Sequence, residues 1–216
     1  MVEASSDRAH IKQSLLTMAA NLFAQFDNFE TVVNHEDKHY IAKQFFEDGS
    51  GCTMIKYRAD GLTEEEWNRW RDDPTAVTLQ LNSNASRVLL PDDHGHKIVQ
   101  LKMKMPLMIS NRSIVTCFYD HETEDGWKMK FHSSQGNEHI VEANAASIGK
   151  DVVASNIIVY FQWRPYEGGM EIWHVQRMNP NGSLPDMFKK KMGKRMANVL
   201  LDIVAYLKSG AAPPEY

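Results

Sequence analysis

The chain has 216 residues, of which 43% are hydrophobic and 24% are charged, and its net charge is −4 at neutral pH. This composition indicates one globular domain with room for an internal cavity, and the acidic excess argues against a general nucleic-acid binder. No apolar run approaches the ~20 residues of a membrane span, and the first residues lack the features of a signal peptide. Cys52 and Cys117 are typical of free thiols in a reducing compartment. We therefore expect one cytoplasmic domain over residues 1–216, with an ordered core of about 8–209.

A change in the spacing of apolar residues predicts a helix followed by two strands at the start of the chain. Apolar residues at three- and four-residue spacing from Ile11 to Phe26 predict a helix. Residues 39–46 and 52–57 are rich in strand formers, and the glycine-containing segment 47–51 between them predicts a hairpin turn.

A short helix and a series of strands come next. Thr63 and Glu66 have the spacing of a capping box, and Pro74 ends the helix that this pair begins. The β-rich segments that follow at hairpin spacing are 99–105, 114–119, 127–131, 152–163 and 170–177. Such a series predicts a mainly antiparallel sheet.

The last element is a long amphipathic helix over residues 185–207. Its apolar residues fall within an arc of roughly 120°, and they are Phe188, Met192, Met196, Val199, Leu200, Ile203 and Leu207. The basic residues on the opposite side are Lys190, Lys191, Lys194 and Arg195. We expect this helix to lie across the sheet, which makes the fold class α+β.

Two stretches of the sequence carry a family resemblance. Residues 105–115 read MPLMISNRSIV and residues 178–185 read MNPNGSLP. In this order, and followed by the long helix, they resemble two motifs of the START (StAR-related lipid-transfer) family. Ser113 and Asn179 stand where that family usually has aspartate, as in a divergent member.

The resemblance implies a helix-grip fold, in which a curved antiparallel sheet wraps around the C-terminal helix and encloses one apolar ligand. Removing about 400 Å² of lipid from water contributes on the order of 10 kcal/mol, so binding needs no cofactor and no covalent chemistry. We expect a monomeric protein that binds or transfers a phospholipid, sterol or similar lipid, with no metal, nucleic acid or catalytic residue. The candidate lipid contacts are Met103, Met105, Arg112, Met129, Phe131, Trp163, Met192, Met196, Val199, Leu200 and Ile203.

The basic side of the last helix has two interpretations. Lys190, Lys191, Lys194 and Arg195 form either an ordinary solvated helix face or a docking surface for anionic membranes. The second is favoured, because these residues lie on the helix that would gate the cavity in an otherwise acidic chain.

Two histidine-containing motifs suggest metal sites. Residues 35–39, HEDKH, match a zinc-protease signature that requires both histidines on one helix face. The polar residues between them and the strand formers from His39 onward favour a connection between elements instead. Residues 92–96, DDHGH, are more typical of a hairpin loop than of a metal site.

An enzyme on the same fold is the main alternative. Its candidate residues are Arg112, His132, Tyr160 and His174, acting on an apolar small molecule. For each histidine a hydrogen-bonded position in the sheet is the simpler interpretation, and Arg112 is at least as well explained by a structural pairing. A ligand-regulated interaction module is a third hypothesis.

Overall fold

The computed structural model describes residues 2–35, 39–72, 84–93, 95–106, 108–182 and 199–210. Its elements in chain order are α1 (Val2–Ala24), η1 (Phe26–Asn28), β1 (Glu30–His35), β2 (His39–Phe45), β3 (Gly51–Asp60), α2 (Glu64–Asp72), β4 (Ala85–Asp93), β5 (His96–Met103), β6 (Arg112–Glu122), β7 (Lys128–Ser133), α4 (Glu138–Ala143), α5 (Ala145–Ile148), β8 (Val152–Val153), β9 (Ser155–Tyr166) and β10 (Gly169–Asn179). Residues 199–208 are also helical, and we call them the C-terminal helix.

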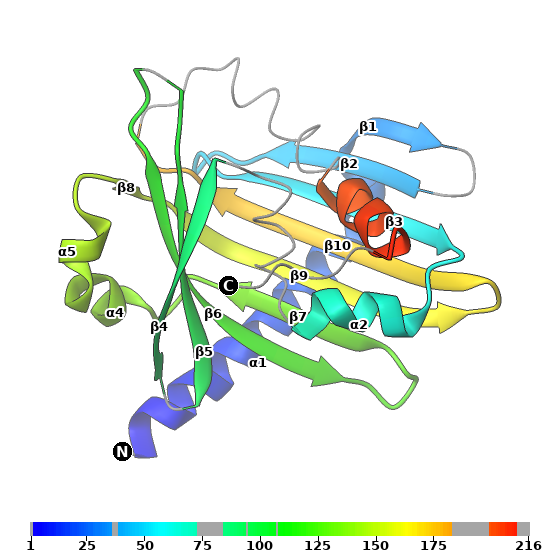
Figure 1. The fold of residues 1–216 in the computed structure, drawn as a ribbon, viewed down its shortest axis with the longest axis horizontal. Coiled ribbons are helices and arrows are strands. Elements are labelled where there is room, and N and C mark those ends of the chain that lie inside the picture. The colour runs from blue at the N-terminus through cyan, green and yellow to red at the C-terminus, as the bar shows by residue number, and fades with distance from the viewer. Residues whose placement is uncertain are drawn as a thin grey trace.

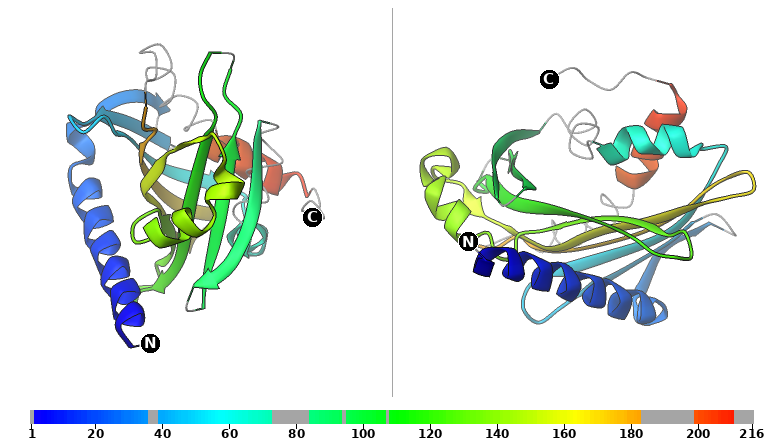
Figure 2. Two further views of the ribbon diagram at one scale, coloured as in Figure 1. Left: turned by 90° about the vertical axis from the view of Figure 1, so that its left-hand side faces the viewer. Right: turned by 90° about the horizontal axis from the view of Figure 1, so that it is seen from below.

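The strands of this part of the chain form one sheet in the order β1-β2-β3-β10-β9-β7-β6-β5-β4. Neighbours along this order are antiparallel, and the short β8 pairs with β6 in parallel. The sheet is curved, with α1 along one face and with α2 and the C-terminal helix on the other (Figures 1 and 2). The predicted α+β helix-grip architecture is confirmed.

Each face of the sheet has its own hydrophobic cluster, because successive strand residues point to opposite sides. On the outer face, Leu15 and Leu22 of α1 pack in a cluster that includes Phe131 and Tyr160. On the inner face, α2 and the C-terminal helix pack in a second cluster that includes Trp163.

The capping box predicted for the short helix is present. Glu66 accepts hydrogen bonds from the backbone N–H of Thr63 at 2.8 Å and from its hydroxyl at 2.9 Å. In return the backbone N–H of Glu66 donates to Thr63 Oγ1 at 3.2 Å. These reciprocal bonds fix the start of α2 and therefore where its tryptophans point.

The zinc-protease interpretation of residues 35–39 is wrong. His35 ends β1 and His39 begins β2, and the two are paired across an antiparallel ladder rather than placed on one helix. The other motif, at 92–96, is a hairpin connection as expected, with Asp93 paired with His96. Among the described residues no group of three or more His, Cys, Asp and Glu side chains is arranged to hold a metal.

Some elements were not predicted from the sequence. Strand β1 and the two short helices α4 and α5 have no counterpart among the predicted elements. Cys52 and Cys117 are both free and buried, as expected. None of the described helices has the length and apolarity needed to cross a bilayer.

Candidate functional site

The inner face of the sheet is the candidate functional site. We define it as the face covered by α2 and the C-terminal helix, and both helices bury apolar side chains against it. Its buried members are Ile41, Ile55, Ala59, Leu62, Trp67, Trp70, Val159, Phe161, Trp163, Met170, Ile172, Leu200, Ile203, Val204 and Leu207.

Helix α2 is tied both to the sheet and to the C-terminal helix. Lys128 of β7 forms an ion pair with Glu64 at 2.5 Å, and Arg69 Nη2 donates to the backbone carbonyl of Leu207 at 2.6 Å. Lys208 Nζ donates to the carbonyl of Asp60, just before α2, at 2.7 Å. These bonds hold the two helices as one cover over the inner face.

An aromatic cluster lies beneath this cover, made of Trp67, Trp70, Phe161, Trp163 and His174. The ring centroids of Trp67 and Trp70 are 4.6 Å apart, and Trp67 lies 6.0 Å from Trp163. Phe161 lies 4.5 Å from Trp70 on one side and stacks on His174 at 4.0 Å on the other. The five rings therefore form one continuous group that spans α2, β9 and β10.

The polar atoms of this cluster are unsatisfied. The indole Nε1 atoms of Trp67, Trp70 and Trp163 and both ring nitrogens of His174 are buried and have no hydrogen-bond partner. His174 is only 4% exposed.

A second histidine faces the same side. His132 Nδ1 is hydrogen-bonded to Thr116 Oγ1 at 2.8 Å, and its ring lies 4.7 Å from that of Phe118. Burial lowers the pKa of both imidazoles to about 3, with the charge of Lys130 adding to the effect at His132 and repulsion between the two protonated rings adding to it at His174. Both rings are therefore neutral at physiological pH, and each has one donor and one acceptor nitrogen.

Three lysines of the inner face are paired with carboxylates. Besides the pair of Lys128 with Glu64, Lys130 lies 3.3 Å from Asp120 and Lys43 lies 3.3 Å from Glu30. The charges of these three lysines are therefore balanced by described carboxylates.

Several predicted lipid contacts lie together on this face. Trp163, Leu200 and Ile203 are buried in the inner cluster, and Val199 packs against it. Met103 and Met105 are half-buried near the end of β5. Met192 and Met196, and the predicted docking residues Lys190, Lys191, Lys194 and Arg195, lie outside the described residues.

Two predicted contacts lie on the other side of the sheet. Phe131 is buried in the outer cluster, and Met129 packs against that cluster. The register explains this, because Phe131 is opposite Tyr160 whereas His132 is opposite Val159. We therefore place Met129 and Phe131 in the outer core.

The candidates for enzyme chemistry do not come together. Tyr160 lies on the outer face and its hydroxyl donates to Gln162 at 3.0 Å. Arg112 is buried and donates to the backbone carbonyls of Pro180 at 2.9 Å and Asn181 at 3.1 Å, and also to that of Ser110. The role that its contacts indicate is structural, with backbone carbonyls as its partners.

The lipid contacts predicted from the sequence do not include the tryptophans of α2 or Phe161. The alternation in β9 holds the missing signal, since assigning Trp163 to the cavity also places Phe161 and Val159 on the same face. The position of α2 over these residues depends on tertiary packing, which no local sequence pattern encodes.

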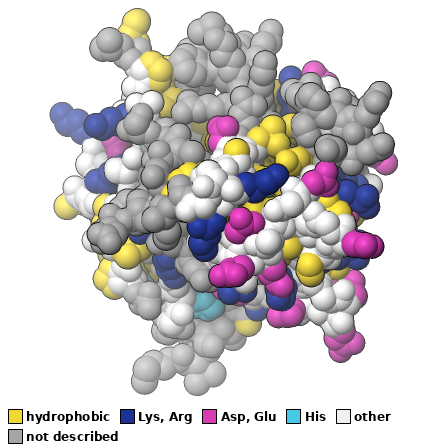
Figure 3. Space-filling view, turned by 45° about the vertical axis from the view of Figure 1, so that its right-hand side comes forward, with side chains coloured by type: hydrophobic (Ala, Val, Ile, Leu, Met, Phe, Trp, Pro, Cys, Tyr) yellow, Lys and Arg dark blue, Asp and Glu magenta, His cyan; other side chains and the backbone are white. Residues whose placement is uncertain are grey.

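A separate hollow of about 300 Å³ lies where β6 and β7 extend beyond the start of β5. It is lined by Lys12, Gly95, His96, Lys97, Phe118, Tyr119, Asp120 and Lys130. Charges of both signs also intermingle on the molecular face drawn in Figure 3, where the described side chains form no patch of one sign.

No family model matches the sequence, and a search of the curated proteins finds no match. Solved structures do match. Human StAR-related lipid transfer protein 5 has a TM-score of 0.72 at 13% identity, over 94% of this chain and 98% of that one. Human STARD10 has a TM-score of 0.69 at 12% identity over 90% and 78%, and a StAR-related lipid transfer protein fragment from Xanthomonas axonopodis has 0.62 at 14% over 83% and 98%. The chain therefore has the fold of the StAR-related lipid transfer domains.

Proposed function

We propose that this domain binds one apolar ligand between the inner face of the sheet and its cover of α2 and the C-terminal helix, and transfers it between membranes. The observation that carries the proposal is the apolar inner cluster on a fold shared with lipid transfer proteins. Burying about 400 Å² of lipid there contributes on the order of 10 kcal/mol, enough for binding without covalent chemistry.

The aromatic cluster occupies the space that a ligand would enter, so the cover must move before a ligand binds. Trp67 and Trp70 are buried and pack against Phe161, so their rings occupy the inner face in this structure. A lipid gains access when α2 and the C-terminal helix move away from the sheet. Besides their apolar packing, polar contacts of Glu64, Arg69 and Lys208 hold these helices in place, and opening the cover requires that they break.

Docking on anionic membranes is the second part of the proposal. Lys190, Lys191, Lys194 and Arg195 lie on the segment just before the C-terminal helix, and each basic residue near an anionic surface contributes ~1 kcal/mol. The neighbours of known structure are lipid transfer proteins, and we propose no enzymatic activity for this chain.

The test is the lipid content of the purified protein, followed by transfer between donor and acceptor vesicles. Mass spectrometry should find a stoichiometric lipid, and Leu200→Trp or Ile203→Trp should reduce uptake because both positions are buried in the inner cluster. The matched control is Ala205→Trp, at an exposed position of the same helix. No bound lipid and no uptake from any vesicle would rule the function out, and equal uptake by all three variants would rule out this location.

A further inference from the structure

The inner face contains buried polar atoms that have no hydrogen-bond partner among the described residues. Three indole N–H groups, from Trp67, Trp70 and Trp163, and both nitrogens of His174 are buried without hydrogen-bond partners. They belong to one continuous group of rings, in which each ring has a neighbour with its centroid within 6.0 Å.

Such a concentration of unpartnered atoms is unusual in a folded interior. Most buried polar groups have a hydrogen-bond partner, and one that lacks it costs about 1–3 kcal/mol. His174 stacks on Phe161. A phenylalanine at position 174 would fill the same space without the cost of unsatisfied polar atoms. Sequence features that lower the stability of the free protein are typical of binding sites.

The chemistry of these atoms defines the group that would satisfy them. An indole nitrogen only donates, and a neutral imidazole donates once and accepts once, so donors outnumber acceptors in the cluster. Oxygen atoms of hydroxyl and carbonyl groups accept such bonds. His132, on the same face, adds another neutral imidazole.

The described ion pairs of the inner face argue against an anion in this role. A buried carboxylate or phosphate needs a cationic partner, and Lys43, Lys128 and Lys130 are already paired with carboxylates. Arg112 is occupied by backbone carbonyls.

We propose that the ligand is an uncharged lipid with a hydroxyl or carbonyl oxygen that accepts hydrogen bonds from His174 and the neighbouring indoles. This inference rests on the lipid-binding function proposed above and narrows its ligand to neutral lipids. A sterol alcohol and a diacylglycerol both have the required oxygen, whereas a fatty acid or an anionic phospholipid adds a charge that the site does not balance.

The experiment uses the delipidated full chain and four lipids presented in vesicles. Cholesterol is compared with 5α-cholestane, which has the same skeleton without the hydroxyl, and 1,2-dioleoylglycerol with dioleoylphosphatidate, which has the same acyl chains and an anionic phosphate. We expect the oxygen-bearing neutral member of at least one pair to bind about tenfold more tightly than its partner, the range of one or two hydrogen bonds. Which pair shows the preference identifies the source of the oxygen.

His174→Phe should abolish this preference and leave the affinity for 5α-cholestane within about twofold of the unmodified chain. The same variant should raise the Tm of the ligand-free protein by about 2–4 °C, because an unsatisfied polar group is removed. Trp163→Phe deletes an N–H from the same cluster and serves as a second variant if His174→Phe does not fold. Tyr160→Phe, which removes a hydroxyl from the outer face, should leave the preference unchanged.

The outcomes separate this inference from the function on which it rests. Uptake without preference, tighter binding of the phosphatidate, or a preference that survives both His174→Phe and Trp163→Phe would overturn the neutral-lipid inference and leave lipid binding standing. Uptake of none of the four lipids would overturn both.

Discussion

Arg112 donates a hydrogen bond from Nε to the backbone carbonyl of Pro180 at 2.9 Å, and so joins the first residue of β6 to the turn that leaves β10. A second bond from Nη2 reaches the carbonyl of Asn181 at 3.1 Å. The two stretches of sequence that resemble family motifs are thus in direct contact. Burial lowers the pKa of this guanidinium. Its carbonyl partners accept hydrogen bonds from its N–H groups and so stabilise the charged form.

Replacing this arginine should therefore destabilise the fold without changing the packing of the inner face. We expect Arg112→Met to lower the free energy of unfolding by about 3 kcal/mol, because the buried bond to Pro180 and the part-buried bonds to Ser110 and Asn181 are lost. Urea denaturation followed by circular dichroism measures the change. Arg164→Met is the control, since Arg164 pairs with Glu171 at the surface and should cost at most about 1 kcal/mol. A loss below 1 kcal/mol at Arg112 would contradict the anchoring role.

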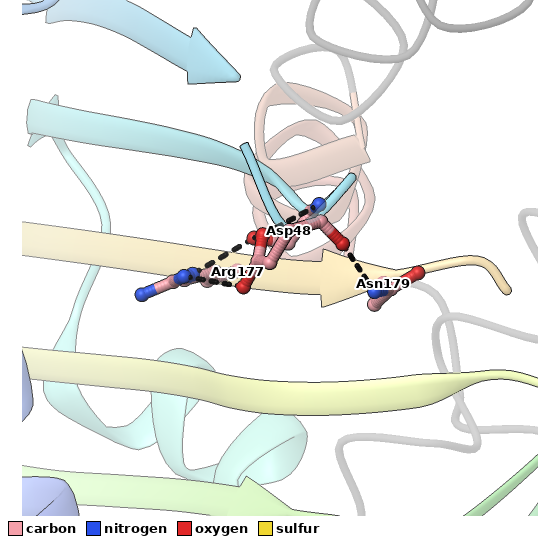
Figure 4. A network of polar contacts seen from close by, with 4 residues as sticks. Asp48, Arg177 and Asn179 are labelled. Carbon is pink, nitrogen blue, oxygen red and sulfur yellow. Dashed lines mark hydrogen bonds and ion pairs between the residues drawn. The ribbon is translucent and has the colours of Figure 1, made fainter. Parts of the chain in front are cut away.

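Asn179 explains one departure from the family pattern. Its side-chain oxygen accepts from the backbone N–H of Asn181 at 3.0 Å, and its amide nitrogen donates to the carbonyl of Asp48 at 2.9 Å (Figure 4). An aspartate could accept the first bond but could not donate the second. The amide thus ties the turn after β10 to the turn between β2 and β3.

Asn179→Asp should accordingly reduce stability by about 1 kcal/mol, through the lost donor and a new negative charge near the Asp48 carboxylate. Thermal unfolding at neutral pH measures it. Asn179→Ser, which can still accept from Asn181, separates the loss of the donor from the added charge. Equal or greater stability of the aspartate variant would show that the bond to Asp48 contributes nothing.

Most elements could be predicted from the sequence because they have a local pattern, as the Thr63–Glu66 box shows, whereas β1, α4 and α5 were not predicted. The side of the sheet on which a given residue lies could not be predicted in this way. Alternation in β7 separates Phe131 from His132, but only the packing of α1 and α2 decides which of them lies on the inner face. The same limit applies to Trp67 and Trp70, whose role depends on α2 folding back over β9.

Membrane docking predicts a dependence on salt and on lipid charge. The protein should bind vesicles that contain anionic phosphatidylserine at low ionic strength and leave them at high ionic strength, because screening shortens the reach of the basic residues. Changing Lys190, Lys191, Lys194 and Arg195 to glutamine should weaken binding by up to about 4 kcal/mol at ~1 kcal/mol each. Vesicle co-sedimentation measures both effects. Equal binding to neutral and anionic vesicles would rule the docking surface out.

The histidines of the inner face should make the stability of the fold depend on pH. His174 has a folded-state pKa of about 3, below its ordinary value of 6.5. Between these values the unfolded chain binds a proton that the folded chain does not, so the free energy of unfolding falls as the pH drops below about 6.5. His174→Phe removes this loss, and its advantage over the unmodified chain should grow by up to about 1.4 kcal/mol per pH unit below 6.5.

Two measurements check this dependence. Urea denaturation of both proteins between pH 7.5 and 5 gives the difference in stability, and proton NMR of the folded chain follows the imidazole directly. The His174 resonance should not move over that range. A titration midpoint near 6.5 would mean that water reaches the imidazole in the free protein, and the ring would then have a partner for the nitrogens on which the neutral-lipid inference depends.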